Sequence, residues 1–175
     1  MQAKLRLAPA RVELERRGGN IYLRSPQKLA PFARCITEWL VRWSDKAPER
    51  TFLAELPTEP VAVRGAPDLI VQMLDKLIDN AVDFSPAGAL ISVRLRLDAQ
   101  VALIEVDNPG PALAAHVQGR LFESLWQSRA GPDSRPHFGL GLYIVRLIAE
   151  FHGGEATALN LPDGSGVRFV VRLAR

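Results

Sequence analysis

Short stretches in which apolar and polar residues alternate recur along the chain, and this period of two predicts β-strands. The first two stretches flank Gly18-Gly19-Asn20, a turn sequence that predicts a β-hairpin within a lead-in segment of residues 1–26. Further short strands are predicted at residues 52–56, 61–63, 90–97, 101–106, 155–160 and 166–173.

Apolar residues spaced three or four positions apart mark the helices. Helices are predicted at residues 27–44, 67–86 and 139–151, with a shorter one near 119–125. Between the last two, residues 127–138 are rich in Gly, Pro, Ser and Arg and have no periodicity, which predicts a mobile loop.

The order of these elements sets the fold class. Strands and helices follow one another without strict β-α-β alternation, which favours an α+β fold. We expect a two-layer α/β sandwich, with a mixed, mostly antiparallel sheet covered on one face by helices. A single domain of residues 27–175 is expected after the lead-in, and 175 residues suffice for a proper core.

Composition narrows the class of protein. Hydrophobic residues make up 47% and charged residues 23% of the chain, and no stretch approaches the roughly 20 apolar residues of a membrane helix. The lone cysteine, Cys35, fits a reducing compartment, so we expect a cytoplasmic location; a longer parent anchored in the inner membrane is compatible with this. The net charge of +3 is spread out, which argues against nucleic-acid binding but suits a site for nucleotide phosphates.

Polar residues on the helix at 67–86 are candidates for chemistry. Lys76 and Asn80 are four apart and share a helix face, as do Asp79 and Asp83. A carboxamide oxygen such as that of Asn80 can ligate a hydrated Mg²⁺ that bridges phosphates. Taken alone, these residues also fit a solvated helix face.

Two further motifs follow. Residues 106–113 end a strand with Asp107-Asn108 and a Gly-Pro turn, and a short polar side chain there can accept a hydrogen bond from an exocyclic amine such as that of adenine. Gly139 and Gly141 open an apolar helix, where free backbone N–H groups bind anions. A plain turn and an ordinary glycine pair are the simpler alternatives for each motif alone.

Together, in this order, the motifs resemble those of the GHKL ATPases. Residues 72–85 resemble the N box, 106–113 the G1 box and 139–154 the G2 box with its His-Gly-Gly ending. Leu121-Phe122-Glu123-Ser124-Leu125-Trp126 is similar to the F box of sensor histidine kinases, which favours these over the other GHKL proteins. Residues 75–84 are also similar, more narrowly, to the sensor kinases of proteobacterial dedicated sortase systems.

The resemblance implies a catalytic domain that binds ATP and Mg²⁺. It implies that Asn80 ligates Mg²⁺, that Asn108 receives the adenine amine, and that Gly110 lies beside the base. The G2 residues implied near the phosphates are Gly139, Leu140, Gly141 and Leu142. Residues 127–138 correspond to the ATP lid, where Arg129 is a candidate phosphate contact or a solvated loop charge.

Three positions depart from the family pattern. Lys76 stands where kinases carry Asn and hydrolytic relatives carry a Glu base, and Asp83 stands where many kinases have Lys or Arg. Lys76 either supplies the phosphate-facing charge that position 83 lacks or pairs with Asp79 or Asp83. Asn108 replaces the family's Asp, and a register that gives its role to Asp107 is an alternative.

The acceptor histidine of such kinases is missing, because His116, His137 and His152 lack the family's acceptor setting. The resemblance therefore implies a fragment that is inactive alone and donates the γ-phosphate to a histidine on its own dimerisation domain, upstream of a response regulator. The alternatives are a degenerate nucleotide-binding module and an anti-sigma-factor-like serine kinase.

Overall fold

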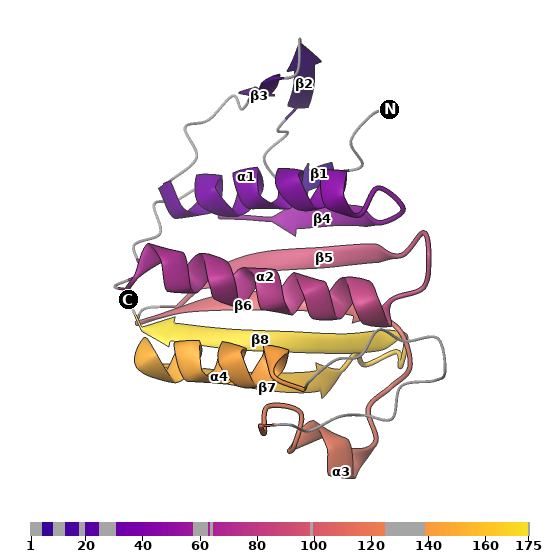
Figure 1. Cartoon of the computed structure of the whole chain (residues 1–175), viewed down its shortest axis with the longest axis vertical. Helices are drawn as coiled ribbons and strands as arrows, with labels where there is room; N and C mark the ends of the chain where they lie inside the picture. Colours follow the sequence, from indigo (N-terminus) through magenta and orange to yellow (C-terminus); the bar gives the residue numbers. More distant parts are fainter. Residues whose placement is uncertain are drawn as a thin grey trace.

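Three long helices lie on one face of a six-stranded sheet (Figure 1). The computed structural model describes residues 5–8, 13–17, 20–24, 31–57, 63, 65–98, 100–124 and 139–174. The helices are α1 (Pro31–Lys46), α2 (Pro67–Phe84), α3 (Ala115–Gln118) and α4 (Gly141–Phe151). The strands are β1 (Leu5–Ala8), β2 (Glu13–Arg17), β3 (Asn20–Arg24), β4 (Thr51–Glu55), β5 (Leu90–Leu97), β6 (Val101–Pro109), β7 (Glu155–Asn160) and β8 (Gly166–Ala174).

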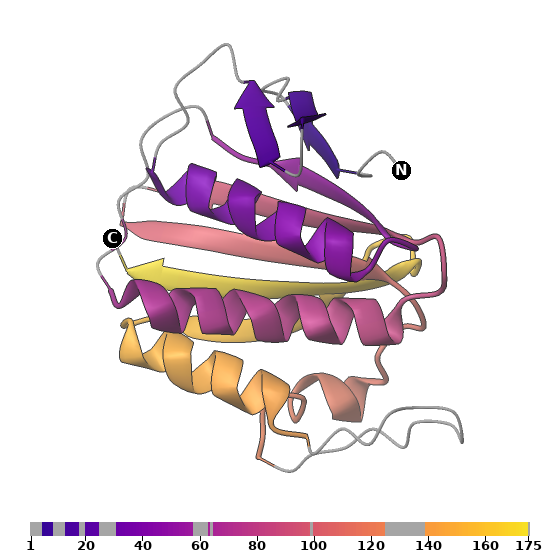
Figure 2. The same cartoon turned by 45° about the horizontal axis from the view of Figure 1, so that its top comes forward.

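The main sheet has the strand order β1-β4-β5-β6-β8-β7. β4 pairs in parallel with β1 and β5, whereas the β5–β6, β6–β8 and β8–β7 pairs are antiparallel. Along the covered face, α1 packs on β1 and β4, α2 on β6, and α4 on β7 and β8 (Figure 2). This arrangement confirms the α+β, two-layer sandwich with a mixed, mostly antiparallel sheet.

The central helix, α2, has clear local signals at both ends. Pro67 lies at its first turn, where a missing N–H costs nothing. Ser85 ends the helix with φ −98° and ψ 147°, because the following Pro86 disfavours a helical conformation at the preceding residue. The sequence therefore fixes the length of the helix that carries Lys76 and Asn80.

The core lies between the helices and the sheet. Alternate strand residues point to the helices and are fully buried, among them Phe52, Ile91 and Ile104. They meet the apolar face of α2, where Met73 and Leu77 have no exposed surface. Each such side chain contributes about 1.5–3 kcal/mol through removal from water, so this interface holds the two layers together.

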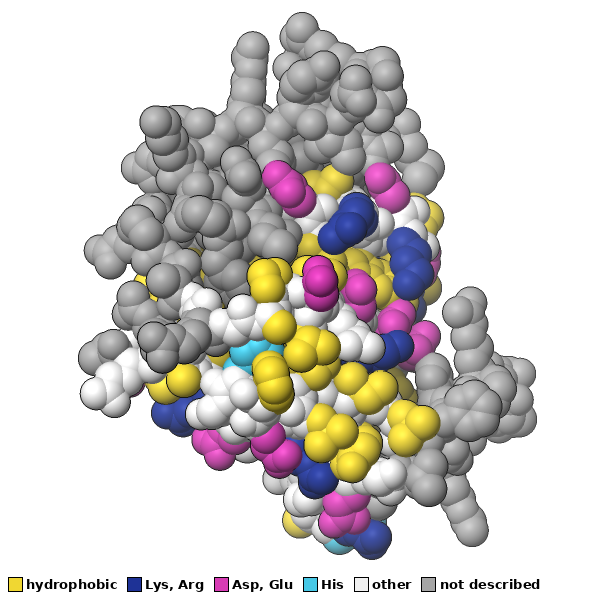
Figure 3. All heavy atoms as spheres, turned by 60° about the vertical axis from the view of Figure 1, so that its left-hand side comes forward, with side chains coloured by type: hydrophobic (Ala, Val, Ile, Leu, Met, Phe, Trp, Pro, Cys, Tyr) yellow, Lys and Arg dark blue, Asp and Glu magenta, His cyan; other side chains and the backbone are white. Residues whose placement is uncertain are grey.

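At one end of the molecule, the end of α4 meets the start of α2. His152 is buried there against Gly65 and Ala66. On the outer side of α4, Leu147 and Phe151 are exposed, and Figure 3 shows hydrophobic side chains gathered on this face of the molecule. None of the helices in the described ranges is long and apolar enough to cross a membrane.

The observed elements correct several predictions. The predicted helix near 119–125 is wrong, because α3 occupies 115–118 and Gly119 serves as its C-cap, followed by turns to residue 124. β6 runs to Pro109, three residues past the predicted end at 106, because β8 pairs with it along that length. α1 begins at Pro31 and ends at Lys46 rather than at 44.

Other predictions are met in part or lie outside the described residues. β2 and β3 pair antiparallel, as the sequence predicts, while the domain boundary between residues 26 and 27 stays a prediction. Val63 is not in a strand, and the rest of the strand predicted around 61–63 is outside the described residues. The predicted loop at 127–138, with Arg129 and His137, also lies outside them.

Candidate functional site

Lys76 of α2 lies beside the start of α4. A Cβ built on Gly141 would stand 4.0 Å from Cδ of Lys76, so the aliphatic stem of the lysine runs against the first helical glycine. The lysine Nζ is 3.8 Å from Oδ2 of Asp79, and 37% of its side chain is exposed. Lys76 therefore pairs with Asp79, while its stem lies beside the start of α4.

Among the described residues, no side chain caps the start of α4. Gly139 has φ +63°, a left-handed conformation that favours glycine, and it turns the chain into the helix. The N-cap is Leu140, whose side chain cannot accept a hydrogen bond from the first-turn N–H groups. Leu142 is buried and anchors this turn in the core, while Leu140 is exposed. The open N–H groups and the helix dipole favour an anion at this point.

Asn80 lies one turn beyond Lys76 on α2 and is half-buried. Asp83 follows and is exposed. Within the described ranges, no group of three or more His, Cys, Asp or Glu residues could hold a metal ion. A metal at this site would therefore be held by the Asn80 carboxamide together with ligand oxygens and water, a donor set that suits Mg²⁺.

Asn108 carries a polar group that lacks a partner. The residue is 3% exposed, and its Oδ1 has no hydrogen-bond partner among the described residues. It faces the helix layer, since it follows Ile104 and Val106 at a spacing of two on β6. A buried acceptor without a donor costs about 1–3 kcal/mol, so the unpartnered Oδ1 of Asn108 requires an explanation.

Gly110 allows the loop after β6 to pass close to the end of α2. A Cβ at Gly110 would stand 2.9 Å from the carbonyl oxygen of Phe84 and 3.9 Å from Nδ2 of Asn108. Any larger residue at position 110 would push these two elements apart. The glycine thus keeps Asn108 next to the C-terminal end of the helix that carries Asn80.

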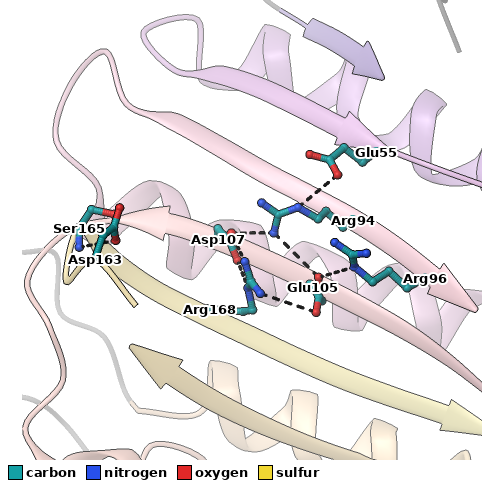
Figure 4. Close-up of polar contacts among 8 residues, drawn as sticks. All are labelled: Glu55, Arg94, Arg96, Glu105, Asp107, Asp163, Ser165 and Arg168. Carbon is teal, nitrogen blue, oxygen red and sulfur yellow. Dashed lines mark hydrogen bonds and ion pairs between the residues drawn. The ribbon is translucent and has the colours of Figure 1, made fainter. Parts of the chain in front are cut away.

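Asp107 points to the opposite face of the sheet, which is charged rather than apolar (Figure 4). Arg94 Nη1 donates to its carboxylate at 2.7 Å, and Arg168 donates through Nε at 2.7 Å and Nη2 at 2.9 Å. Burial opposes ionisation of this carboxyl, but the hydrogen bonds and charges of the two arginines outweigh it and lower its pKa. Engaged in this way, Asp107 is a poor alternative to Asn108.

The structure describes residues 121–124 of the F box. Phe122 is buried and packs edge-on against Phe169 of β8, with ring centroids 6.4 Å apart and an interplanar angle of 79°. Leu125 and Trp126 of the same motif lie outside the described residues. Phe122 therefore fixes the start of the segment that leads towards residues 127–138.

Asn160 is a residue that the sequence did not single out. At the end of β7, its Oδ1 accepts from the Leu113 N–H at 2.7 Å and its Nδ2 donates to the Leu113 carbonyl at 2.9 Å. These two bonds fix the loop that follows Gly110. A single Asn 47 positions away gives no sequence signal for such a contact.

Asp75 is a second residue that was missed. Its Oδ1 accepts from Nε1 of Trp39 at 2.6 Å and from Nε1 of Trp43 at 3.0 Å, so it joins α1 to α2. The three residues line a groove of about 380 Å³, whose other walls are Arg42, Lys46, Gln72, Lys76 and Asp79. Lys76 therefore separates this groove from the start of α4.

The fold is that of histidine kinase catalytic domains. A mycobacterial sensor histidine kinase, MprB, superposes with a TM-score of 0.70 at 24% identity, over 82% of this chain and 93% of that chain. The catalytic domain of histidine kinase ThkA superposes with a TM-score of 0.71 at 23% identity, over 82% and 92% of the two chains. At these identities the likeness shows the fold alone.

Sequence comparison defines the family. Residues 65–175 match the histidine kinase-, DNA gyrase B-, and HSP90-like ATPases, and the chain belongs to this family. The sensor protein CreC of Escherichia coli is 30% identical over all 175 residues, and the sensor protein ChvG of Rhizobium meliloti is 37% identical over 142 residues, or 76% of the chain. The chain covers 35% and 25% of these two relatives. The narrower likeness to sortase-system kinases stays a prediction.

Proposed function

We propose that this chain binds ATP with Mg²⁺ and is the catalytic domain of a two-component sensor histidine kinase. It donates the γ-phosphate to a histidine on a dimerisation domain that is not part of the sequence described. The observation that carries the proposal is the position of the Lys76 stem against Gly141, beside the N-terminus of α4, which no side chain caps. That combination favours a phosphate chain at this point.

The remaining residues of the site bind either the metal ion or the adenine ring of the nucleotide. The Asn80 carboxamide on α2 holds Mg²⁺, which neutralises charge on the phosphates when bound. Asn108 accepts a hydrogen bond from the adenine amine, and its unpartnered Oδ1 supports this role. Gly110 lies beside the base, and Arg129 with residues 127–138 forms the lid over the phosphates. Asp83 lies at the exposed edge of the same helix.

Phosphate transfer from this site needs no general base from this chain. The nucleophile is the imidazole of the acceptor domain, so the chain's task is to position the γ-phosphate and to neutralise its charge. Lys76 cannot activate water as a glutamate does, which favours transfer over hydrolysis. His152 is unsuited as an acceptor because it is buried and hydrogen-bonded, and His116 lacks the acceptor motif of the family.

The partners follow from the same proposal. The acceptor domain docks on the surface formed by the F box and lid, and a response regulator receives the phosphate afterwards. The structural neighbour ThkA has been solved in complex with a response regulator, TrrA. A cytoplasmic location fits these partners.

The test uses the chain, γ-labelled ATP, Mg²⁺ and a purified dimerisation hairpin with its acceptor histidine. We expect an acid-labile, alkali-stable label on the hairpin, and we expect Asn80→Ala to abolish it. Gln100→Ala, a change in the exposed turn between β5 and β6, is the control and keeps full labelling. ATP binding without any label would instead indicate a nucleotide-binding module, which the altered positions 76 and 108 favour. Acid-stable label on a partner serine would indicate a serine kinase.

A further inference from the structure

At position 108, where the nucleotide base is proposed to bind, this chain has the neutral amide of Asn108 and the family pattern has a carboxylate. We propose that Asn108 makes this domain accept guanine nucleotides as well as adenine nucleotides. The inference rests on the proposed function and concerns the choice of base within the same site.

The structure indicates that Asn108 is available to a ligand. Its side chain lies almost wholly inside the protein, yet Oδ1 has no partner among the described residues. Its cross-strand neighbour on β8 is the buried, apolar Val167, whose side chain cannot fix which end of the amide points where. On the β8 side, either end of the carboxamide can therefore face an arriving ligand.

The side chains of Asp and Asn differ in the hydrogen bonds that they can make with a purine base. An ionised carboxylate only accepts hydrogen bonds, so it suits the 6-amino group of adenine and repels the 6-carbonyl oxygen of guanine. A carboxamide has an acceptor and a donor at its two ends. With one orientation Oδ1 accepts from the adenine amine; with the other, Nδ2 donates to the guanine 6-oxygen while Oδ1 accepts from the adjacent ring N–H.

The neighbouring carboxylate of Asp107 does not restore selection against guanine. Asp107 is the adjacent carboxylate on β6, and it points to the other face of the sheet, where Arg94 and Arg168 hold it. Selection against guanine in a buried site depends on a mismatched polar group, which costs far more than a mismatch in size. With a carboxamide at position 108 and Asp107 turned away, that mismatch is absent.

The experiment is a titration of the wild-type chain with ATP and, separately, with GTP in the presence of Mg²⁺. Binding is measured by calorimetry or fluorescence. We expect the two dissociation constants to agree within about tenfold, a difference of about 1.4 kcal/mol or less. Asn108→Asp should weaken GTP binding by roughly a hundredfold relative to ATP. Gln100→Glu makes the same amide-to-carboxylate change in the exposed turn between β5 and β6, outside the motifs of the site, and should leave the ratio unchanged.

Three results would overturn the inference. Wild-type binding of ATP with GTP excluded by roughly a hundredfold or more would contradict it while leaving the proposed function intact. Unchanged GTP affinity in a folded Asn108→Asp protein would remove Asn108 as the cause. Binding of neither nucleotide would overturn the proposed function together with the inference. The wild-type ratio decides the main question even if the variant does not fold.

Discussion

The imidazole Nε2 of His152 accepts a hydrogen bond from the backbone N–H of Ala66 at 3.1 Å, although the two residues are 86 positions apart. The other ring nitrogen, Nδ1, is 2.7 Å from the carbonyl oxygen of Ile148. The ring proton is therefore on Nδ1, and the neutral imidazole bridges the end of α4 and the start of α2. This bridge holds together the two helices that carry the G2 and N boxes.

Replacing Gly65 should break this bridge. A Cβ at Gly65 would stand 2.1 Å from Cδ2 of His152, so Gly65→Ala must displace the ring from Ala66. We expect the free energy of unfolding to fall by about 1–3 kcal/mol in urea denaturation, because the buried His152 ring and the half-buried Ala66 N–H lose their hydrogen bond. Gly119→Ala is the matched control, since Gly119 has φ −72° and nothing lies within 4 Å of its added Cβ. Equal stability of the two variants would contradict the role of His152.

The charged face of the sheet should make stability depend on pH. Asp107→Asn removes the ionic partner of Arg94 and Arg168, and we expect a loss of about 3 kcal/mol at neutral pH. Because the folded protein lowers the pKa of Asp107, the stability it contributes is complete above the ordinary value of about 4. It is lost as the pH falls through the folded-state pKa.

The measurement is thermal or urea unfolding of wild type and Asp107→Asn between pH 7 and pH 3. The difference between the two proteins should shrink as the solution becomes acidic. Arg96→Gln serves as the control on the same face, because Arg96 is 59% exposed and pairs with Glu105, and it should cost less than about 1 kcal/mol. A difference for Asp107→Asn that grew towards acid would show that the ion pairs do not stabilise the sheet.

The contact between α1 and α2 depends on Asp75. Asp75→Ala leaves the indole N–H groups of Trp39 and Trp43 without their acceptor, and both tryptophans are buried. We expect a loss of about 3 kcal/mol and a shift in tryptophan fluorescence. Asp75→Asn retains an acceptor oxygen and should lose less than half as much; a loss as large as that of Asp75→Ala would point to charge rather than hydrogen bonding.

Lys76 and Lys46 offer a matched pair for testing the phosphate side. Both ammonium groups lie near Oδ atoms of Asp79, at 3.8 Å and 3.5 Å, but only Lys76 runs against Gly141. Lys76→Ala should weaken ATP binding roughly tenfold, about 1.4 kcal/mol, as measured by calorimetry. Lys46→Ala, on the α1 side of the groove, should leave the affinity unchanged. Equal effects would mean that Lys76 acts only through Asp79.

Local patterns in the sequence predicted much of this fold. The apolar spacing of α2, the glycines before α4 and the alternation of β5 to β8 are signals that short segments carry within themselves. β1 was not predicted, because its place beside β4 depends on pairing with residues 47 positions away. For the same reason, no local pattern indicated that Asp75 joins two tryptophans or that Asn160 holds Leu113.

The candidate site was predictable to a similar extent. The sequence placed Lys76 and Asn80 on one helix face, and the structure adds that Gly141 of another helix meets Lys76. The position of Gly110-Pro111 favoured Asn108 over Asp107 in the sequence. The register of β6 adds an independent reason, because Arg94 and Arg168 engage Asp107 on the far face.

The two faces of β6 thus have different roles: Asn108 faces the helices, and Asp107 forms ion pairs on the opposite face of the sheet. A slip of one position along this strand would exchange the two faces and bring an arginine-bound carboxylate into the core. The ion pairs on the open face therefore lock the strand in the alignment that keeps the amide inward. Base preference can then evolve by a single change at position 108, without disturbing the architecture that surrounds it.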